Sequence, residues 1–169
     1  KNGDFVIKTA KTEKLTVYCD MTTENGGFTY YAVDKGLTTY KRTDNDSCKA
    51  VGLQMVMPRS KAHWTAMVAK YGGSYFATVP GVYKTSNGGN YTGCKMRSPA
   101  HYGDGCSAWR VGDGGRWWLR DSNYNEPNGD YTANCWLGQS SSNPNDIRFN
   151  DGNCNYSTSK YLCSTNDKK

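Results

Sequence analysis

The stretch Asn125-Glu126-Pro127-Asn128-Gly129-Asp130 decides how this chain is interpreted, together with Phe149-Asn150-Asp151-Gly152-Asn153-Cys154 further along. Each stretch gathers carboxylate and amide side chains shortly before a cysteine, Cys135 in the first case and Cys154 in the second. A bond between these two cysteines would draw the two clusters together. Their oxygen atoms would then be able to surround a hard cation such as calcium, which takes six to eight oxygen ligands. The pattern therefore predicts a calcium site built from two separate segments.

The Glu-Pro-Asn and Phe-Asn-Asp runs resemble the sugar-binding half of the C-type lectin domain. The resemblance extends backwards through Cys48 to Leu53, Met57-Pro58 and Ser60 to Tyr71, and forwards to Tyr161-Leu162-Cys163. It covers about residues 40 to 165 and is weak in the middle, where Tyr75 to Tyr83 stands in place of the family's Trp-Ile-Gly-Leu motif. The resemblance implies an α+β, C-type lectin-like fold with two helices, small antiparallel sheets and a long irregular loop, stapled by disulfides.

The beginning of the chain resembles a different family. Val17 to Thr23 reads Val-Tyr-Cys-Asp-Met-Thr-Thr and is followed by Gly26-Gly27-Phe28-Thr29, which is similar to the opening of a fibrinogen-related domain. We therefore expect two parts, a fibrinogen-like lead-in over residues 1–38, with a β-hairpin and a strand, and a C-type lectin-like domain over residues 39–169. Alternatively, Tyr30 to Val33 is the first strand of the lectin-like body, which would make the lead-in continuous with it.

Seven cysteines without a Cys-x-x-Cys pair indicate an oxidising compartment rather than a zinc ribbon or a redox motif. The lectin resemblance implies the bonds Cys48–Cys163 and Cys135–Cys154. Cys94 and Cys106 flank residues 95–105 and are predicted to close that loop, which leaves Cys19 unpaired. Either the partner of Cys19 lies outside this chain, or Cys19 bridges to another chain in an oligomer.

Composition narrows the class of protein further. The chain has 169 residues with 5 Trp, 13 Tyr and 4 Phe, so we expect an aromatic-rich core that depends partly on disulfides. Its net charge of +6 is dispersed, which argues against a nucleic-acid surface and leaves a weak preference for anionic glycans. Sequons at Asn45, Asn90 and Asn155 favour a secreted or cell-surface glycoprotein, and we expect no membrane insertion by this segment because it lacks a long apolar run.

The lectin resemblance also assigns a site. Glu126 and Asn128 match the family's Glu-Pro-Asn pair, and Asn150 and Asp151 match its Asn-Asp pair, so these residues are expected to hold Ca²⁺ and sugar hydroxyls together. The family's glutamate two positions before the first of these cysteines is Ala133 here, and Asp130 is the nearest carboxylate that would replace it. A Glu-Pro-Asn site is expected to bind mannose-type vicinal diols.

The expected function is therefore an extracellular, calcium-dependent carbohydrate-binding module that serves adhesion or recognition through a glycan or glycoprotein ligand. The alternative is a calcium-independent, lectin-like adhesion module that binds protein or a sulfated glycan. We do not expect an enzyme, since hydrolase and phosphate-loop motifs are missing and the sequence has only His63 and His101 as histidine bases, although paired-carboxylate glycoside hydrolysis stays open.

Local patterns predict several elements. Asp4 to Ile7 and Lys14 to Tyr18 form a hairpin, Phe28 to Val33 a third strand, and Ser60 to Tyr71 a helix capped by Ser60 and stopped by Gly72-Gly73. On that helix we expect His63 to be partly exposed. We interpret Asp20, Asp104, Asp113, Asp121 and Asp146 as solvated loop carboxylates. Trp117 and Trp118 are expected to be core anchors within a strand that ends at Leu119.

Overall fold

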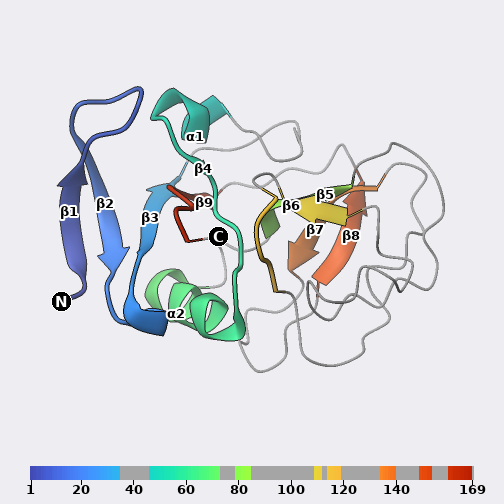
Figure 1. Cartoon of the computed structure of the whole chain (residues 1–169). Coiled ribbons are helices and arrows are strands. Elements are labelled where there is room, and N and C mark those ends of the chain that lie inside the picture. The colour runs from blue at the N-terminus through green and yellow to red at the C-terminus, as the bar shows by residue number, and fades with distance from the viewer. Residues whose placement is uncertain are drawn as a thin grey trace.

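In the part of the chain that the computed structural model describes, the strands form two antiparallel sheets (Figure 1). The structure describes residues 1–34, 46–72, 79–84, 109–111, 114–118, 134–139, 149–153 and 160–168. In spatial order, the five-stranded sheet consists of β1 (Gly3–Ile7), β2 (Leu15–Asp20), β3 (Phe28–Val33), β9 (Tyr161–Ser164) and β4 (Gln54–Met55). The four-stranded sheet consists of β6 (Trp109–Val111), β5 (Val79–Lys84), β7 (Asn134–Gln139) and β8 (Phe149–Asn153).

Within the described ranges, two α-helices accompany the sheets, α1 (Asp46–Ala50) and α2 (Lys61–Tyr71), and a short 3₁₀ turn, η1 (Thr23–Asn25), joins β2 to β3. The α+β class with two helices is thereby confirmed. Its finer assignment to a C-type lectin-like fold stays a prediction.

The five-stranded sheet joins the two ends of the chain. β1 and β2 form the predicted hairpin, with Phe5 opposite Val17, and β3 continues the sheet as predicted. β3 then pairs with the C-terminal strand β9, with Tyr31 opposite Cys163. The predicted boundary between residues 38 and 39 lies outside the described residues, but strands from both sides of it share this one sheet.

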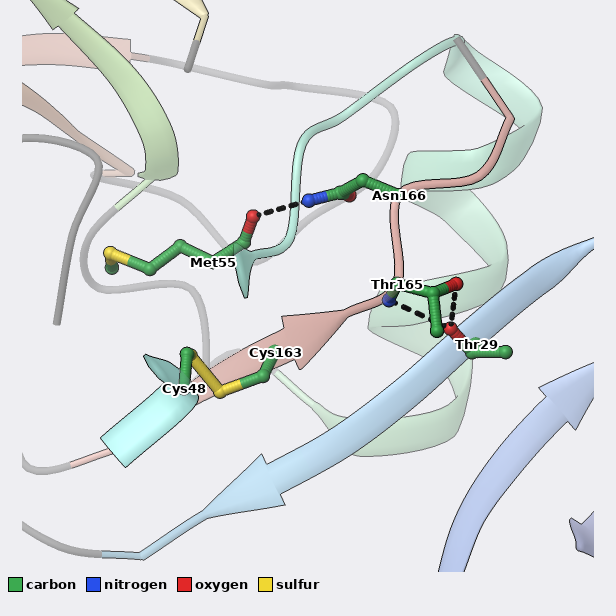
Figure 2. Close-up of a disulfide and its surroundings, with 6 residues drawn as sticks. All are labelled: Thr29, Cys48, Met55, Cys163, Thr165 and Asn166. Carbon is green, nitrogen blue, oxygen red and sulfur yellow. Dashed lines mark hydrogen bonds between the residues drawn. A yellow bond between two sulfur atoms is a disulfide. The ribbon is translucent and has the colours of Figure 1, made fainter. Parts of the chain in front are cut away.

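One face of this sheet is closed by α1 and a disulfide. Alternate residues of a strand point to the same side, so Leu15, Val17 and Cys19 lie together on this face and are buried. Cys48 of α1 belongs to the same core and is bonded to Cys163, with the two Cα atoms 5.5 Å apart (Figure 2). The predicted Cys48–Cys163 bond is confirmed.

The opposite face is covered by α2. Ser60 caps this helix, because its hydroxyl oxygen accepts the His63 backbone N–H at 3.1 Å, and the helix ends at Gly72, as predicted. Trp64 and Met67 of this helix are buried. Tyr71 meets the ring of Tyr30 edge-on, with 5.9 Å between the ring centroids.

Trp117 and Trp118 complete the packing next to α2. Both are buried, as expected, and the Trp118 backbone N–H donates to the carbonyl oxygen of Pro58 at 2.8 Å. Residues 114–118 form no strand, so the strand predicted to include these two tryptophans is wrong. The burial of both tryptophans and the hydrogen bond from Trp118 to Pro58 hold this segment in place, without the hydrogen bonds of a strand.

The turn between β2 and β3 has an unusual backbone. Its residues 24 to 27 all have positive φ, which L-residues other than glycine rarely adopt. A Cβ atom on Gly26 would lie 2.7 Å from the carbonyl oxygen of Met21, so the glycine is a steric requirement. The Lys168 ammonium, from the C-terminal end, donates to the carbonyl oxygens of Glu24 and Gly26 and lies 4.8 Å from the Phe28 ring centroid.

The last residues of the chain form hydrogen bonds with β3 and β4 of the five-stranded sheet. The Asn166 side-chain amide donates to the carbonyl oxygen of Met55 at 2.9 Å, and the Thr165 backbone N–H donates to the Thr29 hydroxyl at 3.0 Å (Figure 2). Asn166 is buried and has a φ of 54°. Its side-chain amide gives a buried backbone carbonyl a hydrogen-bond partner inside the core. The C-terminal segment therefore belongs to the fold of the N-terminal sheet.

Candidate functional site

The predicted calcium site is described only at one of its two segments. Asn150 and Asp151 lie on β8, opposite Gly138 and Leu137 of β7. Glu126, Asn128 and Asp130 lie outside the described residues, as do Cys94, Cys106 and Cys154. The structure therefore places the second cluster in a strand, and the metal and carbohydrate roles of all five residues stay predictions.

The pairing of β7 with β8 bears on the predicted Cys135–Cys154 bond. The register runs from Gln139 opposite Phe149 to Trp136 opposite Gly152, and shifts before Asn134 pairs with Asn153. Cys135 lies within this irregularity, and Cys154 is the residue that follows Asn153 in the sequence. The register brings the backbone at Cys135 close to the end of β8. Cys154 lies outside the described residues, so the Cys135–Cys154 bond stays a prediction.

His63 is the main surprise among the described residues. It was expected to be partly exposed, and the structure corrects this, because only 2% of its surface is exposed. Its ring stacks on Phe28 with 3.9 Å between centroids and an angle of 11° between the planes. The helix pattern did not predict this burial because Phe28 belongs to a strand 35 positions earlier in the sequence.

The surroundings of His63 keep it neutral. Burial, and secondarily the positive charge of Arg59, lowers the pKa of His63 from 6.5 to about 3. Its Nδ1 accepts the Arg59 backbone N–H at 3.1 Å, so the proton of the neutral ring is on Nε2. Nε2 and the Tyr30 hydroxyl are both buried and have no hydrogen-bond partner within the described ranges. His63 is therefore a buried, neutral imidazole on α2. It has a structural role rather than that of a catalytic base open to substrate.

Asp20 is likewise part of the structure. It was interpreted as a solvated loop carboxylate, which is wrong, since it is 3% exposed. Its carboxylate accepts the backbone N–H groups of Thr23 at 2.9 Å and Thr22 at 3.0 Å, and the Thr22 hydroxyl at 3.1 Å. Burial alone would raise its pKa, but these hydrogen bonds hold the pKa of Asp20 below its ordinary value. The Asp-Met-Thr-Thr run, an Asx-type turn signal, was the clue in the sequence.

Cys19 is a free cysteine, and it is buried. Only 9% of its surface is exposed, and burial, followed by the nearby charge of Asp4, raises the pKa of its thiol. A thiol that is buried and protonated attacks other sulfur atoms slowly. Bridging to a second chain through Cys19 would therefore require the hairpin to open.

Comparison with known proteins adds no relative to this picture. Neither the family models nor the curated proteins gave a match to the chain. Within the part of the chain that the structure describes, no helix has both the length and the apolar character needed to cross a bilayer.

Proposed function

We propose that this chain is an extracellular module that binds carbohydrate through a calcium ion. The observation that carries the proposal is the pairing of β7 with β8. β8 contains Asn150 and Asp151, and β7 contains Cys135, which follows the Glu126–Asp130 segment in the sequence. One cluster thus lies on β8, and the other comes shortly before its neighbour β7 in the sequence, which supports a shared cation site.

The chemistry of these residues fits calcium and a sugar diol together. The carboxylates of Glu126, Asp130 and Asp151 would supply charge, and the amide oxygens of Asn128 and Asn150 would complete an oxygen shell at about 2.3–2.6 Å from the ion. Each amide NH₂ group would donate to a sugar oxygen whose own proton goes to a carboxylate. The resemblance of the Glu-Pro-Asn run to C-type lectins implies a vicinal diol of the mannose type, and such binding involves no bond-breaking step.

The Cys48–Cys163 disulfide supports the extracellular part of the proposal. Disulfides form and persist in oxidising compartments and are rare in the cytosol. The bond lies in the core of the five-stranded sheet, where it is a constant part of the fold.

A glycan array with calcium and with chelator tests the proposal, using the wild-type chain and Glu126→Gln. The substitution keeps the size of the side chain but removes the charge that attracts the ion and the better acceptor for a sugar hydroxyl. We expect calcium-dependent binding to mannose-type glycans in the wild type and its loss in the variant. Glu13→Gln is the matched control, because Glu13 is exposed on the first hairpin.

Retention of binding by Glu126→Gln would exclude this role for the Glu-Pro-Asn segment. Binding that persists in chelator would instead favour a calcium-independent adhesion module for protein or sulfated glycan. A glycan released or shortened during incubation would contradict the assignment as a binding module rather than an enzyme.

Thermal unfolding gives a second measurement of the same proposal. An ion that binds only the native state at one hundred times its dissociation constant stabilises it by about 2.7 kcal/mol. That gain raises the melting temperature of a chain of this length by several degrees. We expect the shift with calcium in the wild type and in Glu13→Gln, and its loss in Glu126→Gln. Identical melting curves for the wild type in calcium and in chelator would contradict the site.

A further inference from the structure

Large apolar side chains are exposed on the outer strand of the five-stranded sheet and just after the strand next to it. Of the residues whose burial the structure describes, the large apolar ones that are exposed are Phe5, Val6 and Met21, at 47%, 64% and 51%. Phe5 and Val6 belong to β1, and Met21 directly follows β2. Phe5 and Val6 are consecutive and therefore lie on opposite faces of β1, so a strand added beside β1 would cover apolar side chains on both faces of the sheet.

The backbone of β1 offers a second element of such a site. Among the strands that the structure describes, β1 is the outermost of its sheet, with β2 on one side only (Figure 1). An outer strand presents a row of N–H and C=O groups to which another strand can be added. Apolar side chains along an unpaired strand edge therefore fit an extended segment of another chain.

The charges in and next to β1 favour a second copy of this chain as the partner. Two identical strands can pair antiparallel about a two-fold axis normal to the sheet. Residues opposite each other then point to the same face of the sheet, and because faces alternate along a strand, opposed residues differ by an even number of positions. The axis therefore passes through a residue and not between two residues. An axis at Val6 sets Phe5 opposite Ile7, and Asp4 opposite Lys8, each twice. An axis at Phe5 would set Asp4 opposite Val6 and would leave Lys8 without an opposite charge. The register centred on Val6 is thus self-complementary in both apolar character and charge.

We propose that two copies of this chain form a dimer through antiparallel pairing of β1, with Val6 of each copy on the two-fold axis. The five-stranded sheets of the two copies become one continuous sheet, and Asp4 of each copy pairs with Lys8 of the other. Lys8 forms an ion pair with Glu13 at 2.9 Å in the single chain, with both side chains more than two-thirds exposed. Exposed pairs of this kind contribute little, so Lys8 can change partner at small cost.

The dimer adds something that one chain lacks. It joins two copies of every binding surface, and linked weak sites bind a multivalent target far more tightly than a single site does. The interface itself uses only the first hairpin. It does not depend on the calcium site, and loss of sugar binding in Glu126→Gln leaves it untouched.

Sedimentation equilibrium of the wild type, Asp4→Lys and Lys8→Asp over a range of concentrations tests the interface. Each single variant opposes two pairs of like charges, which should raise the dissociation constant of its homodimer at least about fivefold. An equimolar mixture of the two variants should dimerise as well as the wild type, because in the mixed dimer each position 4 again faces a position 8 of opposite charge. A wild type that stays monomeric at every concentration would overturn the proposal, and so would a dimer that the charge changes leave unaltered.

A cysteine at the axis tests the register. Opposed residues of an antiparallel pair have Cα atoms about 4.5–5.5 Å apart, within the range that a disulfide spans. Val6→Cys should therefore yield a covalent dimer under mild oxidation. Thr16→Cys is the control, because Thr16 lies opposite Val6 within the chain and away from the sheet edge. Cross-linking of Thr16→Cys as fast as Val6→Cys would exclude this register.

Discussion

The two sheets differ in where their strands come from in the sequence. The five-stranded sheet takes β1 to β3 from the start of the chain and β9 from its end, whereas the four-stranded sheet takes all its strands from residues 79–153. The first sheet therefore closes the chain on itself and acts as a frame, and the second is an insertion in that frame. If the proposed function is right, stability and recognition belong to separate parts of this molecule.

Polar residues follow the same division. In the frame, the side chains of Asp20, His63 and Asn166 are buried and make hydrogen bonds that hold turns and strands in place. The polar residues proposed for ligand binding, from Glu126 to Asp151, all belong to the inserted part of the sequence. Changes in the frame should therefore alter the free energy of unfolding, and changes in the insertion should alter binding.

Removal of the Cys48–Cys163 disulfide should have the largest effect on the frame. The bonded residues are separated by 115 positions, and in the chain-entropy model a loop of this size contributes about 4–5 kcal/mol. Cys48→Ala combined with Cys163→Ala should lower the free energy of unfolding by about that amount, measured by denaturant titration. Cys19→Ala, in the same core but outside any bond, should cost far less. Equal losses in the two proteins would mean that packing, not the cross-link, holds the frame.

Acid should weaken the frame through His63. In the unfolded chain its pKa is near 6.5, and in the folded chain it is about 3, so between these values only the unfolded chain binds the proton. The contribution of His63 to the free energy of unfolding should therefore be level well above pH 6.5 and should fall as the pH decreases below it, by up to about 1.4 kcal/mol per pH unit. Denaturant titrations from pH 7 to 4.5 measure this slope while Asp20 is still ionised.

His63→Gln should flatten that slope, whatever it does to stability at pH 7. The same change at His101, the other histidine of the chain, is the matched control and identifies how much of the slope belongs to His63. An unchanged slope in His63→Gln would place the acid-sensitive group elsewhere and would break the assignment of this pH response to the frame.

Two glycines allow a smaller and sharper comparison. Gly26, inside the frame, and Gly72, at its border, have nearly the same backbone conformation, with φ of 79° and 74° and ψ of −167° and 174°. Alanine at either position has to adopt a conformation that is almost exclusive to glycine. A Cβ on Gly26 would also meet the Met21 backbone at 2.7–2.8 Å, whereas a Cβ on Gly72 would meet no atom of the described residues within 4 Å.

Gly26→Ala should therefore destabilise the protein more than Gly72→Ala, by about 1 kcal/mol or more. Thermal melts of both variants give the difference directly, because the conformational cost is common to them. Equal losses would show that the β2–β3 turn shifts to relieve the contact.

Local sequence signals predicted much of the frame. The hairpin followed from two short Val- and Tyr-bearing runs, and α2 followed from Trp64, Met67 and the Ser60 cap. The pairing of β3 with β9 joins residues about 130 positions apart, and no local propensity specifies such a partner. The resemblance did identify Cys48 and Cys163 as partners, which is a long-range contact that strand patterns could not supply.

The polar residues of the frame were harder to predict. His63 lies next to the apolar stripe of α2 and is buried because Phe28 stacks on it, so its environment depends on tertiary structure. Asp20 was missed although the two threonines after it offered a local turn signal. For the candidate site, the strand at Phe149–Asn153 is now part of a sheet, while the role of Glu126, Asn128 and Asp130 depends on chemistry inferred from the sequence.

The disulfide between α1 and β9 also decides what a protease can do to this protein. Every peptide bond between residues 48 and 163 lies inside the covalent loop that the Cys48–Cys163 bond closes. A single cut anywhere in the inserted segment therefore yields two polypeptides that remain joined, and a non-reducing gel would show one band at the mass of the intact chain. The frame would keep both of its ends, and the cleaved protein would come apart only when a reductant and an unfolding step act together.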